Sequence, residues 1–420
     1  MAIGAFLFGS ISDTTGRRES IAVSTGIVFC ASASLSFAQT HFLVNLSVFV
    51  LGLGVAGNNT VLRVYLIECL PVRKRGTCLA VIDTFWVTGY LAALGVSWAL
   101  MPSAILMLGK QFRPSSWRVL VILSGTPSLM IACASGLLPP SPRHSLYRRR
   151  PRRALAVLRQ MYAINNTKHT DTYPVRNLED CVRPDEETNE NRLQEYFTKT
   201  WERVGRVHRP PYKRTTLCGV LACLLRFPGF AWLALWSTHV LRELEGDTAG
   251  WNGTCNLSFQ NVVLGFLRNC DQVNEDSFML LLLVSLGYVL GESLLVIGID
   301  IVGKKPYLIF SGVAGCVASL ALIFRMQRAI RVVLSSIFLA AYAIGHTTTC
   351  VLLLENYPTA LRGTMMGLTK ILPHLAVSAT LLLPRTVCPL TTLVVASVSL
   401  MGAALVMLPV LDLTRLPMKE

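Results

Sequence analysis

The chain has 420 residues, of which 52% are hydrophobic and only 15% are charged, and its formal net charge is +15. Soluble domains carry about 25% charged residues, so this composition excludes an ordinary soluble protein. The basic balance does not indicate nucleic-acid binding, because the positive charges gather in short links between long apolar runs.

Ten apolar runs follow one another along the chain, and most are near the length of about 20 residues that a helix needs to cross a bilayer. Together they predict an all-α, polytopic membrane protein. The runs lie at residues 20–38, 42–63, 78–101, 117–138, 216–237, 278–299, 307–325, 332–354, 364–384 and 390–411.

The links that join these runs are basic on one side of the predicted membrane. They contain Arg17-Arg18, Arg73-Lys74-Arg75, Lys304-Lys305 and Arg362. Because cytoplasmic loops carry an excess of Lys and Arg, this side is predicted to be the cytosol.

Two motifs in these links occur twice. The link DTTGRR at 13–18 returns as DIVGKK at 300–305, and LIECLPVRKRGT at 66–77 returns as LLENYPTALRGT at 353–364, with six of twelve positions identical. Both pairs are offset by 287 residues, which indicates a duplication. Six apolar runs separate the copies, so the halves are parallel repeats about an axis along the membrane normal.

The repeat also predicts a gap at the start of the chain. Asp300 ends the second span of its half, whereas Asp13 is preceded only by MAIGAFLFGSIS, about half a span. We therefore expect that the first helix of the first half, and part of the second, are missing from this N-terminally truncated sequence.

The first repeated motif predicts a latch between the halves. Gly16 and Gly303 allow a tight turn, and Asp13 and Asp300 can face helix N-termini or cationic side chains across the halves. The alternative is a basic turn that only anchors the topology. The remaining residues of this motif are Arg17, Arg18 and Lys304.

The second repeated motif predicts an ion pair at each membrane edge. Pro71 and Pro358 end their helices, which lets the following arginine fold back toward the preceding glutamate. The basic residues of the first motif offer competing partners, so these pairs are either a conformational switch or static salt bridges. The motif residues are Glu68, Arg75 and Gly76 in one copy and Glu355, Arg362 and Gly363 in the other.

Several ionisable residues lie inside the predicted spans, where each should face the bundle interior, a cavity or a partner. Asp83 and Trp86 are three residues apart and share one helix face. An aromatic ring there can stack on an organic or cationic ligand, although packing against lipid is the alternative. Sequence alone does not pair the ionisable residues, which are Arg63, Asp83, Arg226, Glu292, His346, Lys370 and His374. Phe230 and Trp232 complete the predicted cavity residues.

Two polar segments interrupt the spans and divide the chain. The central loop 141–214 lies between the halves 1–140 and 215–420, and its part 143–214 holds 17 Lys and Arg against 9 Asp and Glu. Anionic lipid headgroups are the expected partners of such a loop, with a solvated topology determinant as the alternative.

The second polar segment, 240–277, should lie on the lumenal or outer side. It carries glycosylation sequons at Asn252 and Asn256. A disulfide between Cys255 and Cys270 would close this loop, and two free thiols are the alternative.

No catalytic constellation, nucleotide-binding loop or metal-ligand spacing occurs in the sequence. We therefore expect no enzymatic activity, no cofactor and no metal, and any transport is expected to be secondary.

The stretch GSISDTTGRR at 9–18 resembles the loop signature of the major facilitator superfamily, G-x-x-x-D-R-x-G-R-R, and LPPSPRHSLYRRRP at 138–151 resembles the segment that follows the sixth helix of sugar and organic-ion transporters. DTFWVTGYLAALGVSWAL, SSWRVLVILSGTPSL and YKRTTL resemble the synaptic vesicle glycoprotein two family. This resemblance implies two six-helix halves, alternating-access transport of an unknown small organic solute, and a secretory or synaptic vesicle membrane. In that family the counterpart of Trp86 lines the central site.

The chain departs from these patterns at several positions. Thr14 stands where an arginine is expected, Pro140 replaces a glutamate, and Val48 replaces an arginine. His346 and Cys350 stand where close relatives have Trp and Asp, and Phe230-Ala231 replaces a pair of tyrosines. These departures favour one alternative, a vesicle glycoprotein that acts in trafficking or exocytosis without transporting. A plasma-membrane organic-ion transporter is a further alternative.

Overall fold

The structure of the protein is a computed structural model. It describes residues 1–100, 116–178, 192–226, 275–324, 327–382, 389–414 and 416–418. All the regular elements in these ranges are helices. The predicted all-α fold is therefore confirmed.

The first half and the central loop contain eight α-helices in the described ranges. They are α1 (Ala2–Thr15), α2 (Arg17–Phe37), α3 (His41–Cys69), α4 (Arg75–Leu100), α5 (Ser116–Ala134), α6 (Pro142–Tyr147), α7 (Pro151–Asn166) and α8 (Arg192–Val207). Short 3-10 turns lie at Val72–Lys74, Ser135–Leu137 and Thr170–Thr172.

The second half begins with a helical stretch over residues 213–226. Five further helices follow it in the described ranges. They are α12 (Glu275–Val302), α13 (Lys304–Ala321), α14 (Arg328–Asn356), α15 (Arg362–Leu382) and α16 (Pro389–Met407).

Helix boundaries repeat at the offset that the motifs predict. The helices α3 and α14 each have 29 residues and begin 287 positions apart, at His41 and Arg328. The same offset relates the starts of α2 and α13 and of α4 and α15. Local chemistry sets these boundaries, because a glycine with positive φ precedes α2 and α13, and Pro71 and Pro358 follow α3 and α14.

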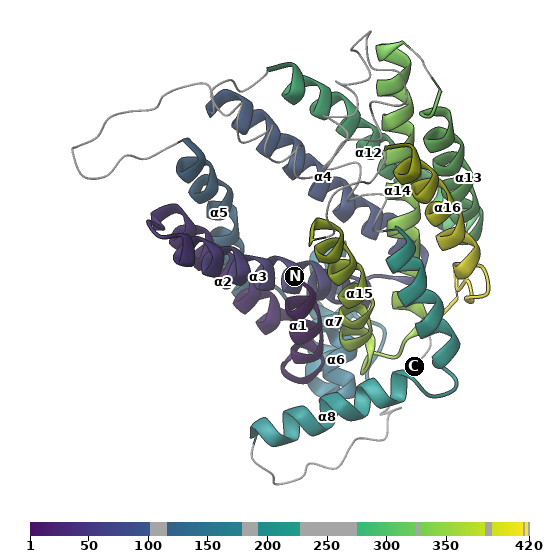
Figure 1. Cartoon of the computed structure of the whole chain (residues 1–420). Helices are drawn as coiled ribbons and strands as arrows, with labels where there is room; N and C mark the ends of the chain where they lie inside the picture. The colour runs from purple at the N-terminus through teal and green to yellow at the C-terminus, as the bar shows by residue number, and fades with distance from the viewer. Residues whose placement is uncertain are drawn as a thin grey trace.

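The halves meet through two equivalent helix pairs. Within the first half α2 packs on α3 and α5, and within the second α13 packs on α14 and α16. Between the halves, α1 packs on α15 and α4 packs on α12 (Figure 1). Helix α1 is equivalent to α12, and α4 is equivalent to α15. The contact of α1 with α15 and the contact of α12 with α4 are therefore related by a pseudo-twofold axis.

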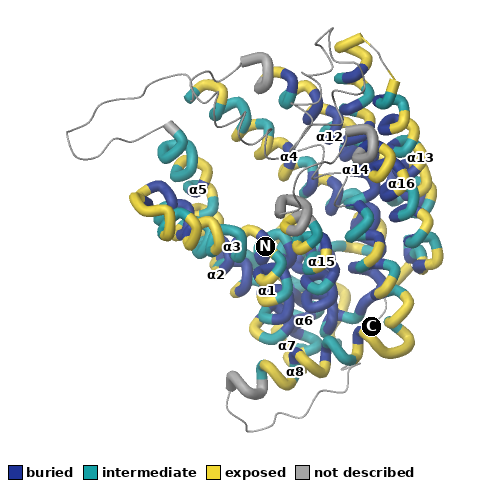
Figure 2. The backbone as a smooth tube through the Cα atoms, in the orientation of Figure 1, coloured by how far each residue is buried: buried dark blue, intermediate teal, exposed yellow. Residues whose placement is uncertain are grey.

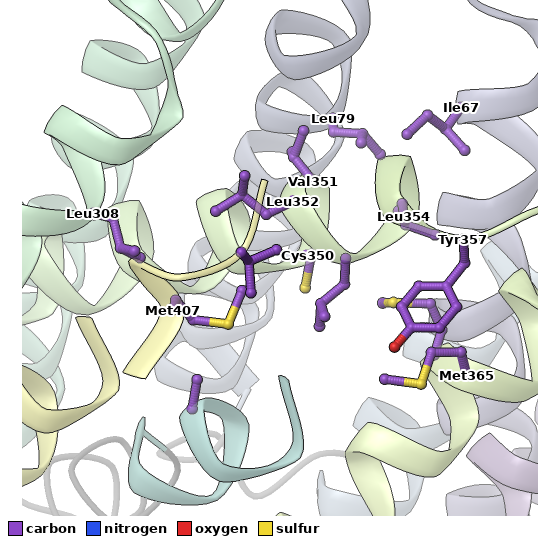
Figure 3. Packing of buried hydrophobic residues seen from close by; sticks show 14 of the residues in the cluster. Ile67, Leu79, Leu308, Cys350, Val351, Leu352, Leu354, Tyr357, Met365 and Met407 are labelled. Carbon is purple, nitrogen blue, oxygen red and sulfur yellow. The ribbon is translucent and has the colours of Figure 1, made fainter. Parts of the chain in front are cut away.

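The core is centred on α14, which is buried over most of its length (Figure 2). Its residues Val351, Leu352 and Leu354 lie in one apolar cluster with Ile67 of α3 and Leu79 of α4 (Figure 3). The cluster thus joins both halves, and it excludes water from the contact between them.

The outer faces of the helices are apolar and exposed, as at Leu290, Ile297, Val317 and Val398. A water-soluble protein rarely exposes such surface, whereas lipid covers it at little cost. Six helices in the described part are long and apolar enough to span a membrane. The chain is an integral, multi-pass membrane protein. The six lie at Arg17–Phe37, His41–Cys69, Val72–Leu100, Trp117–Leu137, Met279–Val302 and Arg328–Asn356.

The short helices of the central loop gather on the basic side of the bundle, where α6 contacts α3 and α7, and α8 contacts α15. Ser141 caps α6 by accepting a hydrogen bond from His144 N, and Pro142 occupies the first helical turn. Tyr65 Oη donates to Pro139 O at 2.8 Å. These contacts fix α6 against the end of α3.

Candidate functional site

The first latch joins the end of α1 to the start of α15. The carboxylate of Asp13 accepts hydrogen bonds from Gly363 N at 3.2 Å and from Thr364 N at 2.8 Å. It also accepts from Thr364 Oγ1 at 2.9 Å. Asp13 therefore caps the N-terminus of a helix in the other half, where the helix dipole favours negative charge.

The second latch repeats this geometry with the halves exchanged. Asp300, near the end of α12, accepts hydrogen bonds from Gly76 N at 3.2 Å and from Thr77 N at 2.8 Å. The glycine is needed for this approach, because a Cβ atom on Gly76 would lie 2.7 Å from Asp300 Oδ1. Each half thus caps one helix of the other on the basic side.

Glu68 lies at the centre of a buried network beside the first latch. Its Oε1 lies 2.9 Å from Arg17 and 3.6 Å from Arg362, and its Oε2 accepts from Ser141 Oγ at 2.6 Å. Arg17 also reaches Asp13 at 3.2 Å and donates to Thr359 O. The sequence predicted a pair between Glu68 and the arginine of its own motif, Arg75; the structure shows that Arg362, the equivalent arginine of the other half, also approaches Glu68.

The matching network in the second half includes the segment after α16. Lys304 Nζ lies 2.8 Å from Glu355 Oε2 and 3.5 Å from Asp412 Oδ1. The backbone N–H of Lys304 donates to Asp412 Oδ2 at 3.1 Å. Burial alone would raise the pKa of Asp412, but its hydrogen bonds with Thr414 and the charge of Lys304 hold it below the ordinary value.

The two remaining arginines of the motifs differ in burial, and Arg75 is fully buried. Arg75 donates to Leu416 O at 3.4 Å, which ties α4 of the first half to the chain after α16. Arg18 is partly exposed, lies 3.4 Å from Glu19 and donates to Leu138 O.

A second group of polar residues, the central cluster, lies between the halves within the spans; its members are buried except for His346, which is half-buried. It consists of Arg63, Asp83, Glu292, His346 and Thr347. Arg63 pairs with Asp83 at 2.7 Å and donates to His346 Nε2 at 3.1 Å. The Thr347 hydroxyl lies 2.6 Å from Asp83 Oδ2 and 2.8 Å from Glu292 Oε1.

The Thr347 hydroxyl imposes a condition on the two carboxyl groups. It has one hydrogen and can donate to only one of them. The second short contact is a hydrogen bond only if that carboxyl group carries a proton and donates to the hydroxyl. Glu292 is fully buried, and its Oε2 has no hydrogen-bond partner. Two hydrogen bonds at this hydroxyl therefore require one of the two carboxyl groups to be protonated.

The duplication extends into this cluster. Thr60 and Thr347, Arg63 and Cys350, and Asp83 and Lys370 are pairs of equivalent positions at the 287-residue offset. Thr347 donates to Asp83, and Lys370 Nζ donates to Thr60 Oγ1 at 3.2 Å. Arg63 donates to the Sγ of its own equivalent, Cys350, at 3.0 Å.

The sequence analysis names Glu292 and Lys370 among the ionisable residues inside the spans, but it does not place them or Thr347 among the cavity residues. Applying the same offset to polar positions inside the spans is the signal that points to Thr347 and Lys370. The offset gives no such signal for Glu292, because its equivalent in the first half is Ala5.

An aromatic surface continues from the cluster along α4 and α12. Trp86 lies on the face of α4 that carries Asp83 and is 48% exposed. Its ring stacks on Tyr90 at 6.4 Å and lies 5.8 Å from the ring of Tyr288. Trp86 thus packs onto aromatic neighbours, and about half of its surface is exposed.

The other predicted residues fall outside the described ranges. They are the cavity candidates Phe230 and Trp232, the sequon residues Asn252 and Asn256, and the cysteines Cys255 and Cys270. Arg226, near the first of them, is buried and donates to Gly345 O and Thr349 Oγ1 of α14.

Two repeated helical halves, cross-half helix caps and a buried polar cluster between them define the major facilitator fold. The solved structure of the major facilitator proton:xylose symporter XylE, bound to 6-bromo-6-deoxy-D-glucose, matches 99% of this chain and 86% of its own, with a TM-score of 0.70 at 16% sequence identity.

The family model described as "Sugar (and other) transporter" matches residues 1–270, and the chain belongs to this family. The chain is also similar to human synaptic vesicle glycoprotein 2B, with 26% identity over 266 residues, covering 59% of this chain and 39% of the relative. With human synaptic vesicle glycoprotein 2A it shares 30% identity over 167 residues, covering 39% and 22%. The matches thus span less than half the length of these curated relatives.

Proposed function

We propose that the protein is a secondary transporter that carries a small organic solute by alternating access and exchanges a proton at the central cluster. The observation that carries this proposal is the pairing of Asp83 and Glu292 through one Thr347 hydroxyl, buried between the halves. Ionisable groups are costly within a membrane, and those placed between moving parts mark solute or proton pathways.

The proposed proton site works through the partners of the two carboxyl groups. Arg63 pairs with Asp83, whereas the hydrogen-bond partner of Glu292 among the described residues is the Thr347 hydroxyl. Other titratable groups packed close by are Tyr288 and Cys350. We infer that Glu292 holds the proton in this state. Separation of the halves would break the contact of Thr347 with Asp83 of the first half and open Glu292 to water, so that the proton can leave.

The charge around the cluster favours an anionic solute. Three cationic side chains lie in or beside the cluster, because Arg63 pairs with Asp83, Arg226 contacts α14 and Lys370 contacts Thr60; against them stand two carboxyl groups, one of which we take to be protonated. A solute carboxylate would compensate this excess, and the aromatic surface at Trp86 would hold an apolar or ring portion of the same solute. The relatives named as synaptic vesicle glycoproteins support a vesicle membrane as the location.

The test is uptake by the purified full chain in proteoliposomes, with and without an imposed pH gradient. The solutes are a radiolabelled panel of monosaccharides, organic anions and organic cations. We expect accumulation of an organic anion to be driven by the gradient. In Glu292→Gln, whose neutral amide imitates the protonated acid, the gradient should lose its effect while solute exchange at equal pH is retained.

Glu202→Gln, at an exposed glutamate of α8, is the matched control and should behave like the wild type. Gradient-driven uptake that survives in Glu292→Gln would contradict the proton role. Uptake of no member of the panel by correctly folded protein would favour the trafficking alternative, and localisation to the plasma membrane would favour the organic-ion transporter there.

A further inference from the structure

A cavity of about 170 Å³ lies on the basic side, between the α1–α2 turn and the start of the central loop. Its walls include Gly16 and Arg17 from the turn and Ser141 and His144 from α6. One water occupies roughly 30 Å³ in the liquid, so the cavity has room for a group the size of a phosphate.

The walls of this cavity are strongly basic. Five arginines line it, and Glu19 is the one acidic residue among its lining residues. The arginines are Arg17, Arg18, Arg148, Arg150 and Arg153. Arg17 is fully buried and held in place by Asp13 and Glu68, whereas Arg148, Arg150 and Arg153 are exposed and have no acidic partner among the described residues. Exposed arginines around a fixed buried one can close over an anion.

His144 is a second, independent sign of a ligand. Its side chain is only 8% exposed, lines the cavity, and has an Nε2 atom without a hydrogen-bond partner. Burial and the nearby charges of Arg17 and Arg148 lower the pKa of His144 to about 2, so the ring is neutral. A buried polar atom without a partner is costly. A phosphate group can satisfy this atom in either tautomer, because it offers both acceptor oxygens and a P–OH.

Two helix N-termini border the same cavity. The first turn of α2 contributes Arg17 and Arg18, and no side chain caps this helix. The residue before α7 is Arg150, and α7 also lacks a side-chain cap. Helix N-termini favour anions, which adds to the charge of the arginines.

We propose that this cavity binds a phosphate group, carried either by an inositol phospholipid of the cytosolic leaflet or by a soluble phosphate compound. A tetrahedral anion with several charges matches the spread of guanidinium groups better than a carboxylate does, since arginine forms paired hydrogen bonds with phosphate oxygens. The position at the membrane edge suits a headgroup, and the volume of the cavity suits a single phosphate.

Occupation of this cavity is linked to the first latch through shared residues. Arg17 and Ser141 line the cavity and both contact Glu68. A bound phosphate would hold α6 against the α1–α2 turn and so stabilise the arrangement in which the basic side is closed. Binding itself does not depend on transport, so this inference stands apart from the proposed function.

The experiment uses the full chain in nanodiscs. One arm compares phosphatidylcholine alone with phosphatidylcholine containing phosphatidylinositol 4,5-bisphosphate. The other arm adds inositol hexakisphosphate or inorganic phosphate to phosphatidylcholine discs. Native mass spectrometry counts bound ligands, and thermal unfolding reports stabilisation. Binding in the first arm alone identifies the lipid headgroup, and binding in the second identifies a soluble source.

Two variants test the position of the site. The triple variant Arg148→Gln, Arg150→Gln and Arg153→Gln should weaken binding by at least about tenfold. The charge-matched control Arg209→Gln, Lys213→Gln and Arg214→Gln removes three exposed cations elsewhere on the basic side and should weaken it by no more than about twofold.

His144→Ala removes no charge and should still weaken binding measurably, which diffuse electrostatic attraction does not predict. Equal losses in the two triple variants, an unchanged affinity in His144→Ala, or the absence of binding in both arms would overturn the proposal.

Discussion

Gly16 and Gly303 show how a repeated residue can be required by backbone geometry alone. Their φ and ψ angles are 124° and 157° for Gly16 and 98° and 167° for Gly303. This region of φ/ψ space is nearly restricted to glycine. It lets the chain reverse in one residue, so that α1 and α12 each end with an aspartate facing the other half.

Gly303→Ala should therefore destabilise the protein by about 1–3 kcal/mol. The cause would be backbone strain and not a clash, because the nearest atom to an added Cβ is Asp412 Oδ2 at 3.6 Å. Gly26→Ala, in α2 with open space around it, is the matched control and should be neutral or slightly stabilising. Thermal unfolding in detergent measures both, and equal midpoints for the two variants would refute the strain argument.

At the scale of helices, the sequence predicts much of the fold. Motifs repeated at a constant offset of 287 residues show which helices of the two halves are equivalent. Apolar length and the proline and glycine positions predict where the helices begin and end. The offset does not state which elements touch across the axis. The contact of Glu68 with Arg362, and that of Asp13 with the start of α15, depend on how the two halves pack. The sequence of a single motif does not predict that packing.

The central cluster was only partly predictable for a related physical reason. Asp83, Trp86 and His346 stand out because charged and aromatic residues are conspicuous inside apolar spans. Thr347 does not stand out, because a threonine hydroxyl can form its hydrogen bond with a backbone carbonyl of its own helix. Its role becomes visible only when α4 and α12 place Asp83 and Glu292 beside it.

The capping of a helix by the opposite half leads to a prediction about conformation. Asp300→Ala removes the acceptor for Gly76 N and Thr77 N of α4. Loss of such a cap costs about 1 kcal/mol, which corresponds to about a fivefold shift toward conformers open on the basic side. Distances between spin labels at Thr15 and Val302, the exposed ends of α1 and α12, report this shift in a background without other exposed cysteines.

The control for this prediction is a cap that lies within one half. Thr40 Oγ1 accepts a hydrogen bond from Leu43 N at the start of α3, so donor and acceptor both belong to the first half. Thr40→Ala should lower the unfolding midpoint but leave the spin-label distances unchanged. If Thr40→Ala and Asp300→Ala change the distances equally, the cap at Asp300 does not act as a latch.

At the scale of the whole molecule, the structure is closed on the basic side, because both latches and the apolar cluster at α14 join the halves there. Alternating access requires α1 to separate from α15 and α4 from α12. The polar networks at the two interfaces allow this, since their charged groups can take up water when the halves part. Packing inside each half has no such requirement and should persist in every state.

Glycine substitutions distinguish these two kinds of contact. Gly367 lies where α15 crosses α1, and an added Cβ would lie 2.5 Å from Ala5 O, whereas at Gly291 it would lie 2.6 Å from Ala340 O within the second half. Gly367→Val should hold the halves apart on the basic side, because opening relieves the clash. Gly291→Val cannot be relieved by opening and should lower stability or expression instead. The same spin-label distances and thermal unfolding separate these effects. Closed-state distances in a stably folded Gly367→Val would mean that the halves do not rock about this interface.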